Sequence, residues 1–202
     1  VVLVFRNLAP LDEGDRARLR EFGARSGIAI HLQPGDLNSV HPLDPEMPPL
    51  RFALPAYGVD FEFRPLDFVQ VNGDMNRRMI DHALGLLDPQ PEDRVLDLFC
   101  GLGNFTLPLA RRAGRVVGVE GEAGLVQRAR DNAARNGIAN VEFHAADLTR
   151  DLRAESWARQ GFDKLLLDPP RTGADAAIPQ LPLEDVRRIV YVSCHPGSLA
   201  RD

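Results

Sequence analysis

From residue 94 onward, short apolar runs alternate with helix-like stretches at a regular pace, and this alternation limits the fold more than any other feature of the sequence. Nearly continuous apolar runs are typical of parallel strands that helices cover on both faces. Helices are predicted between them over about residues 104–112 and 122–136. The sequence therefore predicts a doubly wound α/β domain. The five predicted strands are residues 95–99, 116–119, 141–144, 162–167 and 189–193.

Before that point, the chain consists of short β-like runs joined by proline-rich connections. Strands are predicted over residues 1–5 and 28–32, with a solvated helix over 12–25 between them. Residues 51–54 and 59–63 alternate as the two strands of a hairpin would.

Two segments lead from these strands to the sheet domain. Residues 33–50 hold too many prolines for a regular element, so we expect a surface loop there. A helix is predicted over about residues 74–87. We place the domain boundary at its start, so that a small α+β region, 1–73, precedes the parallel-sheet domain, 74–202. One stripe of this helix is predicted to consist of Met75, Met79, Ala83 and Leu87.

Charge and cysteine content narrow the function classes. The 202 residues carry a net charge of −5, which argues mildly against binding nucleic acid by charge alone. Cys100 and Cys194 form neither a disulfide framework nor a metal cluster, so we predict no metal site and a reducing, cytoplasmic compartment. No apolar run approaches the roughly 20 residues that cross a bilayer, so no membrane partner is expected.

Two glycines follow the first strand of the predicted sheet. Ligands of open parallel sheets bind at the carboxyl ends of the strands, and Gly101 and Gly103 let the backbone approach a ligand there. A dinucleotide-binding fingerprint would require a third glycine where Thr106 stands. A nicotinamide dehydrogenase is therefore the weaker alternative for this turn.

Three carboxylates follow the next three strands. Glu120 occupies the position from which an acidic residue holds a ribose diol, and Asp147 and Asp168 follow the third and fourth strands. The sequence offers no lysine or further glycine for a pyrophosphate. A nucleoside ligand without phosphate fits this set, and the positive sulfonium of S-adenosylmethionine is compatible with an acidic rim.

The last two strands indicate the kind of acceptor. Arg171 follows Asp168-Pro169-Pro170, at the position where amino-group methyltransferases have an aromatic ring, which argues against attack by an adenine amine. Cys194 follows the fifth strand beside His195, which could favour the thiolate, whereas Cys100 is interpreted as a small buried hydrophobe. Addition of a thiolate to carbon-6 of uracil would make carbon-5 nucleophilic enough to accept a methyl group.

With the segment 67–72, these motifs give the chain its resemblance to the RNA uracil-5-methyltransferases, which have an α/β, Rossmann-like class I methyltransferase sheet, incomplete here. The form Phe-x-Gln-Val-Asn at 68–72 makes it most similar to the branch that methylates a uridine of bacterial 23S ribosomal RNA. The resemblance implies that Cys194 is the catalytic nucleophile and that ribosomal RNA is the partner. It also implies a site for S-adenosyl-L-methionine lined by Gln70, Phe99, Gly101, Gly103, Asn104, Glu120, Asp147 and Asp168.

The chain departs from the family in two respects. His195 stands where the family generally has asparagine, which bears on the placement of the target base. The family also has an RNA-binding barrel, a 4Fe-4S cluster and a catalytic glutamate that are absent from these residues. We therefore expect a fragment of a longer enzyme, poorly active or inactive alone, with the cluster upstream of Val1 and the general base beyond residue 202.

Two other functions stay open. One is a methyltransferase for another RNA or for a small molecule. The other is a non-catalytic module that binds a nucleoside or RNA. No obligate protein partner is expected in either case.

Overall fold

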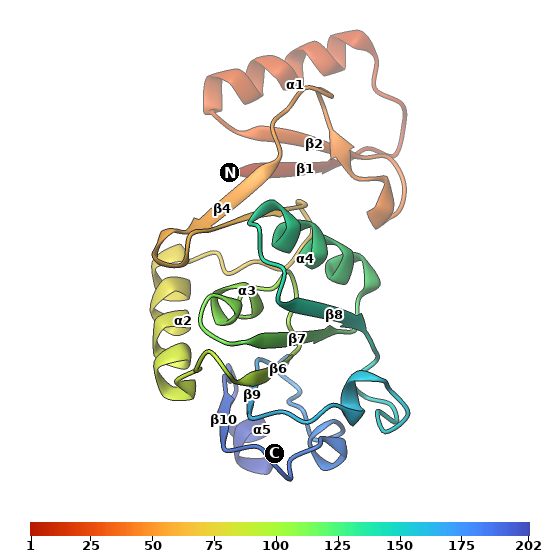
Figure 1. Ribbon diagram of the computed structural model, residues 1–202. Coiled ribbons are helices and arrows are strands. Elements are labelled where there is room, and N and C mark those ends of the chain that lie inside the picture. Colours follow the sequence, from red (N-terminus) through yellow and green to blue (C-terminus); the bar gives the residue numbers. More distant parts are fainter. The chain divides into compact units, whose positions relative to one another are not determined.

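The computed structural model describes residues 1–202, and the chain forms two compact units (Figure 1). The first unit comprises Val1–Arg51 and Glu62–Asp67, and the second comprises Phe52–Phe61 and Phe68–Asp202. The sequence placed the boundary between residues 73 and 74. In the structure, the tip of the hairpin and residues 68–73 group with the second unit instead. None of the helices combines the length and the apolar character that a membrane span requires.

The first unit is a small sheet with one helix. Strands β1 (Val2–Arg6) and β2 (Ala29–Gln33) are parallel, and α1 (Glu13–Ser26) connects them, as predicted. Asp12 and Asp15 form a capping box at the start of α1, and Gly27 ends the helix with a φ of 67°. The core of this unit is Ile30, Leu32 and Leu43, against which Leu19 and Phe22 of α1 pack.

The expected loop over residues 33–50 contains two short elements, so that prediction was wrong in part. The Asp36 side chain accepts hydrogen bonds from the N–H groups of Asn38 and Ser39 and so starts the 3₁₀ helix η1 (Leu37–Ser39). Strand β3 (His41–Pro42) then pairs antiparallel with β2. A proline is compatible with β3 because that strand is at the edge of the sheet.

The predicted hairpin is confirmed. Its strands are β4 (Leu50–Leu54) and β5 (Val59–Phe63), and η2 (Pro55–Tyr57) forms the turn. The rings of Phe52 and Phe61 stack across the strands with centroids 4.7 Å apart.

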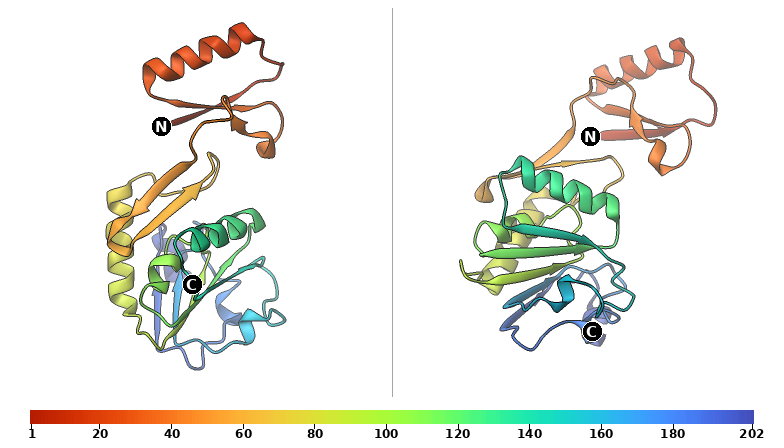
Figure 2. Two further views of the ribbon diagram at one scale, coloured as in Figure 1. Left: turned by 45° about the horizontal axis from the view of Figure 1, so that its top comes forward. Right: turned by 45° about the vertical axis from the view of Figure 1, so that its right-hand side comes forward.

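The second unit contains a five-stranded parallel sheet in the order β10-β9-β6-β7-β8, which Figure 2 shows from two sides. The chain runs outward from β6 to β7 and β8, and then crosses back to β9 and β10 on the other side of β6. The topological switch point therefore lies between β6 and β9. All five predicted strands are present, with shifted ends: β6 (Arg94–Leu98), β7 (Arg115–Glu120), β8 (Val141–Ala145), β9 (Lys164–Leu167) and β10 (Arg188–Tyr191).

Three α-helices cover one face of this sheet and no long helix covers the other, whereas the sequence predicted helices on both faces. Helix α2 (Gly73–Leu87) packs against β9 and β10, and α3 (Thr106–Ala110) and α4 (Ala123–Arg135) pack against β7 and β8. The long connections before β9 and β10 cover the other face. They contain η3 (Trp157–Arg159) and η4 (Ile178–Gln180), and a separate apolar cluster forms there around the fully buried Trp157. These connections are rich in turn residues, but they carry enough apolar side chains to replace a helix.

The buried stripe of α2 differs from the predicted one. Ala83 and Leu87 are buried, but Met75 is 57% exposed. A helix turns once in 3.6 residues, so a stripe drawn strictly at every fourth residue drifts away from the contact face. The buried side chains of α2 are Asn76, Ile80, Ala83, Leu84 and Leu87.

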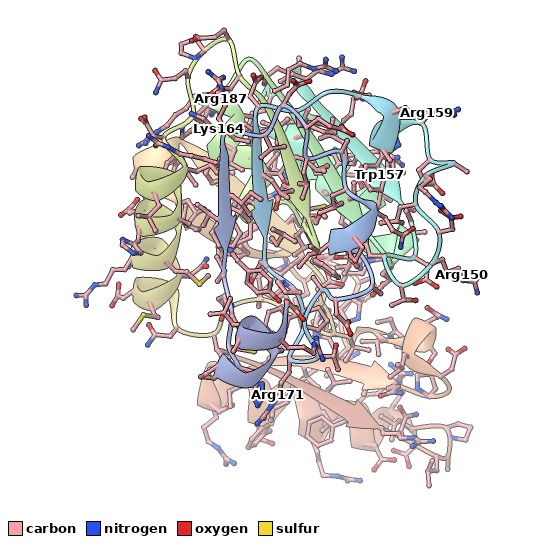
Figure 3. The ribbon with its side chains drawn as sticks, turned by 90° about the horizontal axis from the view of Figure 1, so that it is seen from below. Arg150, Trp157, Arg159, Lys164, Arg171 and Arg187 are labelled. Atoms are coloured by element: carbon pink, nitrogen blue, oxygen red, sulfur yellow. The ribbon has the colours of Figure 1, made fainter.

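An ionic cluster fixes the end of the sheet where the strands begin. The fully buried carboxylate of Asp93 lies 2.7 Å from Nζ of Lys164 and 2.7 Å from a guanidinium nitrogen of Arg187. Burial alone would raise the pKa of Asp93, but hydrogen bonds from Lys164 and the Gln90 N–H, with the charges of Lys164 and Arg187, lower it. Figure 3 shows Lys164 and Arg187 together at the end of the sheet opposite Arg171. The cluster is thus remote from the edge where a ligand is expected.

We predict that Lys164→Met lowers the free energy of unfolding by about 3–5 kcal/mol, because it leaves a buried carboxylate without its most buried partner. The Asp93 pKa is lowered in the folded state, so the ionised cluster stabilises the fold above the unfolded pKa of Asp93 and is lost as the pH falls through the folded value. Urea unfolding at pH 7 measures the difference. Arg153→Met is the control, because it breaks an exposed pair with Asp151 and should cost at most about 1 kcal/mol. Equal losses in the two variants would contradict the prediction.

Candidate functional site

The carboxyl ends of β6 to β10 form one edge of the sheet, here called the carboxyl edge. After β6 the chain turns sharply, because Phe99, Gly101 and Gly103 have φ values of 63°, 53° and 90°. Glycine adopts this region freely, whereas Phe99 is strained there. The predicted close turn of backbone before α3 is therefore confirmed.

Glu120 ties this turn to the end of β7. Its Oε2 accepts a hydrogen bond of 3.1 Å from the Gly101 N–H, and its Oε1 accepts one of 3.1 Å from the Glu122 N–H. A carboxylate has about four acceptor sites, so these two bonds leave capacity for two further donors. Glu120 and Gly101, which the sequence predicted to act together, are thus in direct contact.

Asp97 is a buried acid at this edge for which the sequence analysis assigned no role. Its side chain is fully buried, Oδ2 accepts a 2.5 Å hydrogen bond from the Thr106 hydroxyl, and Oδ1 has no partner. Burial, and then the charges of Asp168 and Glu120, raise the pKa of Asp97 to about 8. The same hydrogen bond gives Thr106 a structural role. The sequence analysis noted Thr106 only because a dinucleotide-binding fingerprint would have glycine at that position.

Asp168 follows β9 and is largely withdrawn from water. Burial raises its pKa to about 6. Because Asp168 and Glu120 both act on the pKa of Asp97, the three carboxyl groups form one electrostatic group. Two of the three predicted acids, Glu120 and Asp168, thus belong to this group, and Asp97 is an additional member.

Other predicted residues are at or near the edge, without direct contact to this group. Asp147 is exposed after β8, and hydrogen bonds from Thr149, with the charge of Arg150, lower its pKa. Gln70 is exposed in the segment that leads into α2. The amide of Asn104, by contrast, is held by two hydrogen bonds with Asn76, a residue to which the sequence analysis gave no role.

The two cysteines lie in opposite environments. The Cys100 thiol is buried beneath the turn, and burial raises its pKa well above the usual value. It faces Gly118, where a Cβ would come within 3.0 Å of the sulfur. Cys194 is exposed after β10. Cys100 is thus a packed hydrophobe, as expected, and Cys194 is an accessible thiol at the carboxyl edge.

His195 caps a helix, a role that the sequence analysis did not predict. Its Nδ1 accepts a 3.1 Å hydrogen bond from the Ser198 N–H and so caps α5 (Pro196–Arg201). An asparagine Oδ1 would occupy the same position relative to the backbone, so the asparagine that the resemblance leads us to expect would cap α5 in the same way. Pro196 is the first residue of the helix, so His195 directly precedes it at the position where a side chain can cap the helix.

The family described as tRNA (Uracil-5-)-methyltransferase matches residues 53–202. The chain belongs to this family. All 202 residues align with relatives named 23S rRNA (uracil(1939)-C(5))-methyltransferase RlmD, at 63% identity for Xanthomonas campestris pv. campestris (strain 8004) and 62% for Stenotrophomonas maltophilia (strain R551-3). The chain spans 46% of the length of each of these relatives.

A solved member of the family supports the fold. The Pyrococcus abyssi tRNA (uracil-54, C5)-methyltransferase, determined with S-adenosyl-L-homocysteine, matches with a TM-score of 0.69 and 28% identity over 87% of this chain and 43% of that one. The expected Rossmann-like methyltransferase sheet is therefore confirmed.

We predict that His195→Asn leaves the free energy of unfolding nearly unchanged, whereas His195→Ala lowers it by about 1 kcal/mol. Asparagine keeps the acceptor for the Ser198 N–H, and alanine removes it. Thermal unfolding of the two variants measures the difference. If both substitutions cost the same, the ring does not act through the cap.

Proposed function

We propose that the protein containing this chain transfers a methyl group from S-adenosylmethionine to carbon-5 of a uridine in 23S ribosomal RNA. One observation carries the proposal. An acidic group around Glu120 and Asp168 lies at the carboxyl edge beside the switch point, and an exposed thiol, Cys194, follows the next strand of the same edge. The identity to the 23S enzymes over the whole chain supports this choice of substrate class.

The residues of the carboxyl edge fit the methyl donor chemically. S-adenosylmethionine, when bound, supplies an activated methyl group on a positively charged sulfur. The free acceptor sites of Glu120 suit two ribose hydroxyls, and Asp168 supplies negative charge. The unpartnered Oδ1 of the buried Asp97 marks unused hydrogen-bonding capacity beneath the turn. The further residues proposed to line the site are Gln70, Phe99, Gly101, Gly103, Asn104 and Asp147.

Cys194 is proposed to act as a covalent catalyst. Its thiolate forms a bond to carbon-6 of the uracil, and the electrons of the 5,6 double bond move onto the ring as an enolate. Carbon-5 then attacks the methyl carbon of S-adenosylmethionine, the bond from that carbon to the sulfur breaks, and the donor leaves as the neutral thioether S-adenosylhomocysteine. Removal of the proton from carbon-5 restores the double bond and expels the thiolate. Exposure of Cys194 is what this step requires, because the sulfur must reach a base brought by a large RNA.

Because the pKa of Asp168 is raised, binding of S-adenosylmethionine is expected to depend on pH. We predict that affinity for S-adenosylmethionine increases several-fold between pH 5 and pH 7, because ionisation of Asp168, with a pKa of about 6, adds attraction for a positive ligand. Asp168→Asn should bind more weakly at pH 7 and lose most of this pH dependence. Isothermal titration calorimetry of the full-length protein measures both. An unchanged profile in Asp168→Asn would exclude Asp168 as its source.

We predict that the full-length protein forms a denaturation-resistant adduct with 23S RNA containing 5-fluorouridine, because fluorine cannot leave carbon-5 as a proton does. Cys194→Ser should form no adduct. Cys100→Ala is the matched control, and it should still form the adduct because Cys100 is buried. Gel electrophoresis under denaturing conditions detects the product.

The same gel distinguishes the acceptor. A fluorinated transfer RNA is offered in parallel, because the Pyrococcus abyssi structure is named a tRNA enzyme. Trapping of ribosomal RNA but not of transfer RNA supports the proposal. Trapping of transfer RNA alone would replace the proposed substrate, and an adduct that persists in Cys194→Ser would exclude the proposed nucleophile.

A further inference from the structure

Asn76 and Asn104 form a closed pair of side-chain amides. Nδ2 of Asn76 donates to Oδ1 of Asn104 at 2.9 Å, and Nδ2 of Asn104 donates to Oδ1 of Asn76 at 2.9 Å. Each amide thereby satisfies one donor and one acceptor, and each keeps one further N–H and one acceptor site. The side chain of Asn104 is therefore fixed in orientation while half of its hydrogen-bonding capacity stays free.

Asn76 occupies an unusual place for an amide. It is 4% exposed, and the other buried residues of α2 are all apolar. A buried amide is costly unless it is hydrogen-bonded, and Asn104 is the side chain that bonds it. Asn104 itself is half-buried and lies in the turn that follows β6.

The pair also joins two separate parts of the proposed donor site. Asn76 lies in the first turns of α2, where its N–H bonds to the carbonyl of Asn72, the residue that caps the helix. Gln70 precedes that cap by two residues. Asn104 belongs to the turn after β6. The amide pair therefore connects the start of α2 to that turn.

We propose that Asn76 is a positioning residue for the methyl-donor site, which holds the amide of Asn104 ready for the ligand. This inference rests on the proposed function. Asn76 does not need to touch the ligand itself, since its effect passes through Asn104. Because the pair already fixes the side chain of Asn104, less conformational entropy is lost at this residue when the ligand binds.

The test is a double-mutant cycle in the full-length protein, with the dissociation constant for S-adenosylmethionine as the readout. Asn76→Ala should weaken binding by roughly three- to tenfold, the cost of ordering one side chain. In an Asn104→Ala background the same substitution should not change the dissociation constant further, because Asn76 acts on the ligand only through the amide of Asn104. A purely structural role would not produce this non-additivity.

Asn132→Ala is the matched control, because Asn132 is also a buried asparagine, 1% exposed, on α4. It should lower the melting temperature and leave the dissociation constant unchanged. If Asn76→Ala does not fold, Asn76→Ser replaces it, since serine keeps a polar group on the buried face. A cycle in which the two effects multiply, or wild-type affinity in a folded Asn76 variant, would overturn the proposal. Failure of the unmodified protein to bind S-adenosylmethionine would instead overturn the proposed function.

Discussion

Strand β6 pairs with β7 on one side and with β9 on the other, and the geometry of the carboxyl edge depends on this double pairing. Leu98 is in register with Val119 of β7 and with Leu167 of β9. Because the three strands are parallel and end at the same level, Phe99, Glu120 and Asp168 leave the sheet together. The pairing of the strands therefore brings these three residues to one edge of the sheet.

The acidic side chains of Asp97 and Asp168 lie at the carboxyl edge where the sheet shields them from water. Asp97 lies within β6 between Gly118 and Leu166, so its carboxyl group has no access to solvent. Burial raises its pKa to about 8 and that of Asp168 to about 6. Both shifts mean that the ionised form of the carboxyl group is disfavoured at this edge. A positive ligand would favour the ionised forms of both. Glu120 and Asp168 are among the acidic residues behind the formal net charge of −5.

The sequence predicts what depends on local pattern. The apolar runs define the five strands, and the strand ends alone identify Glu120, Asp168 and Cys194 as candidates. It does not predict what depends on contacts across the fold. The pair of Asn76 and Asn104 is an example, because the two residues are 28 positions apart in sequence. The second face of the sheet was also misjudged, because a core formed by irregular connections around Trp157 has no periodic pattern to recognise.

The thiol of Cys194 is exposed, but hydrogen bonds hold the chain in place on both sides of it. Before it, the Tyr191 hydroxyl donates a 2.6 Å hydrogen bond to Oδ2 of Asp202, which also accepts one from the Ala174 N–H. After it, His195 caps α5. The cysteine thus lies between two points that are tied to the fold, one on β10 and one at the start of a helix. A nucleophile needs both access and a fixed position, because misplacement by about 1 Å can cost a factor of about 100 in rate. The segment from Tyr191 to Ser198 meets both needs, and it does so with hydrogen bonds that leave the sulfur itself uncommitted.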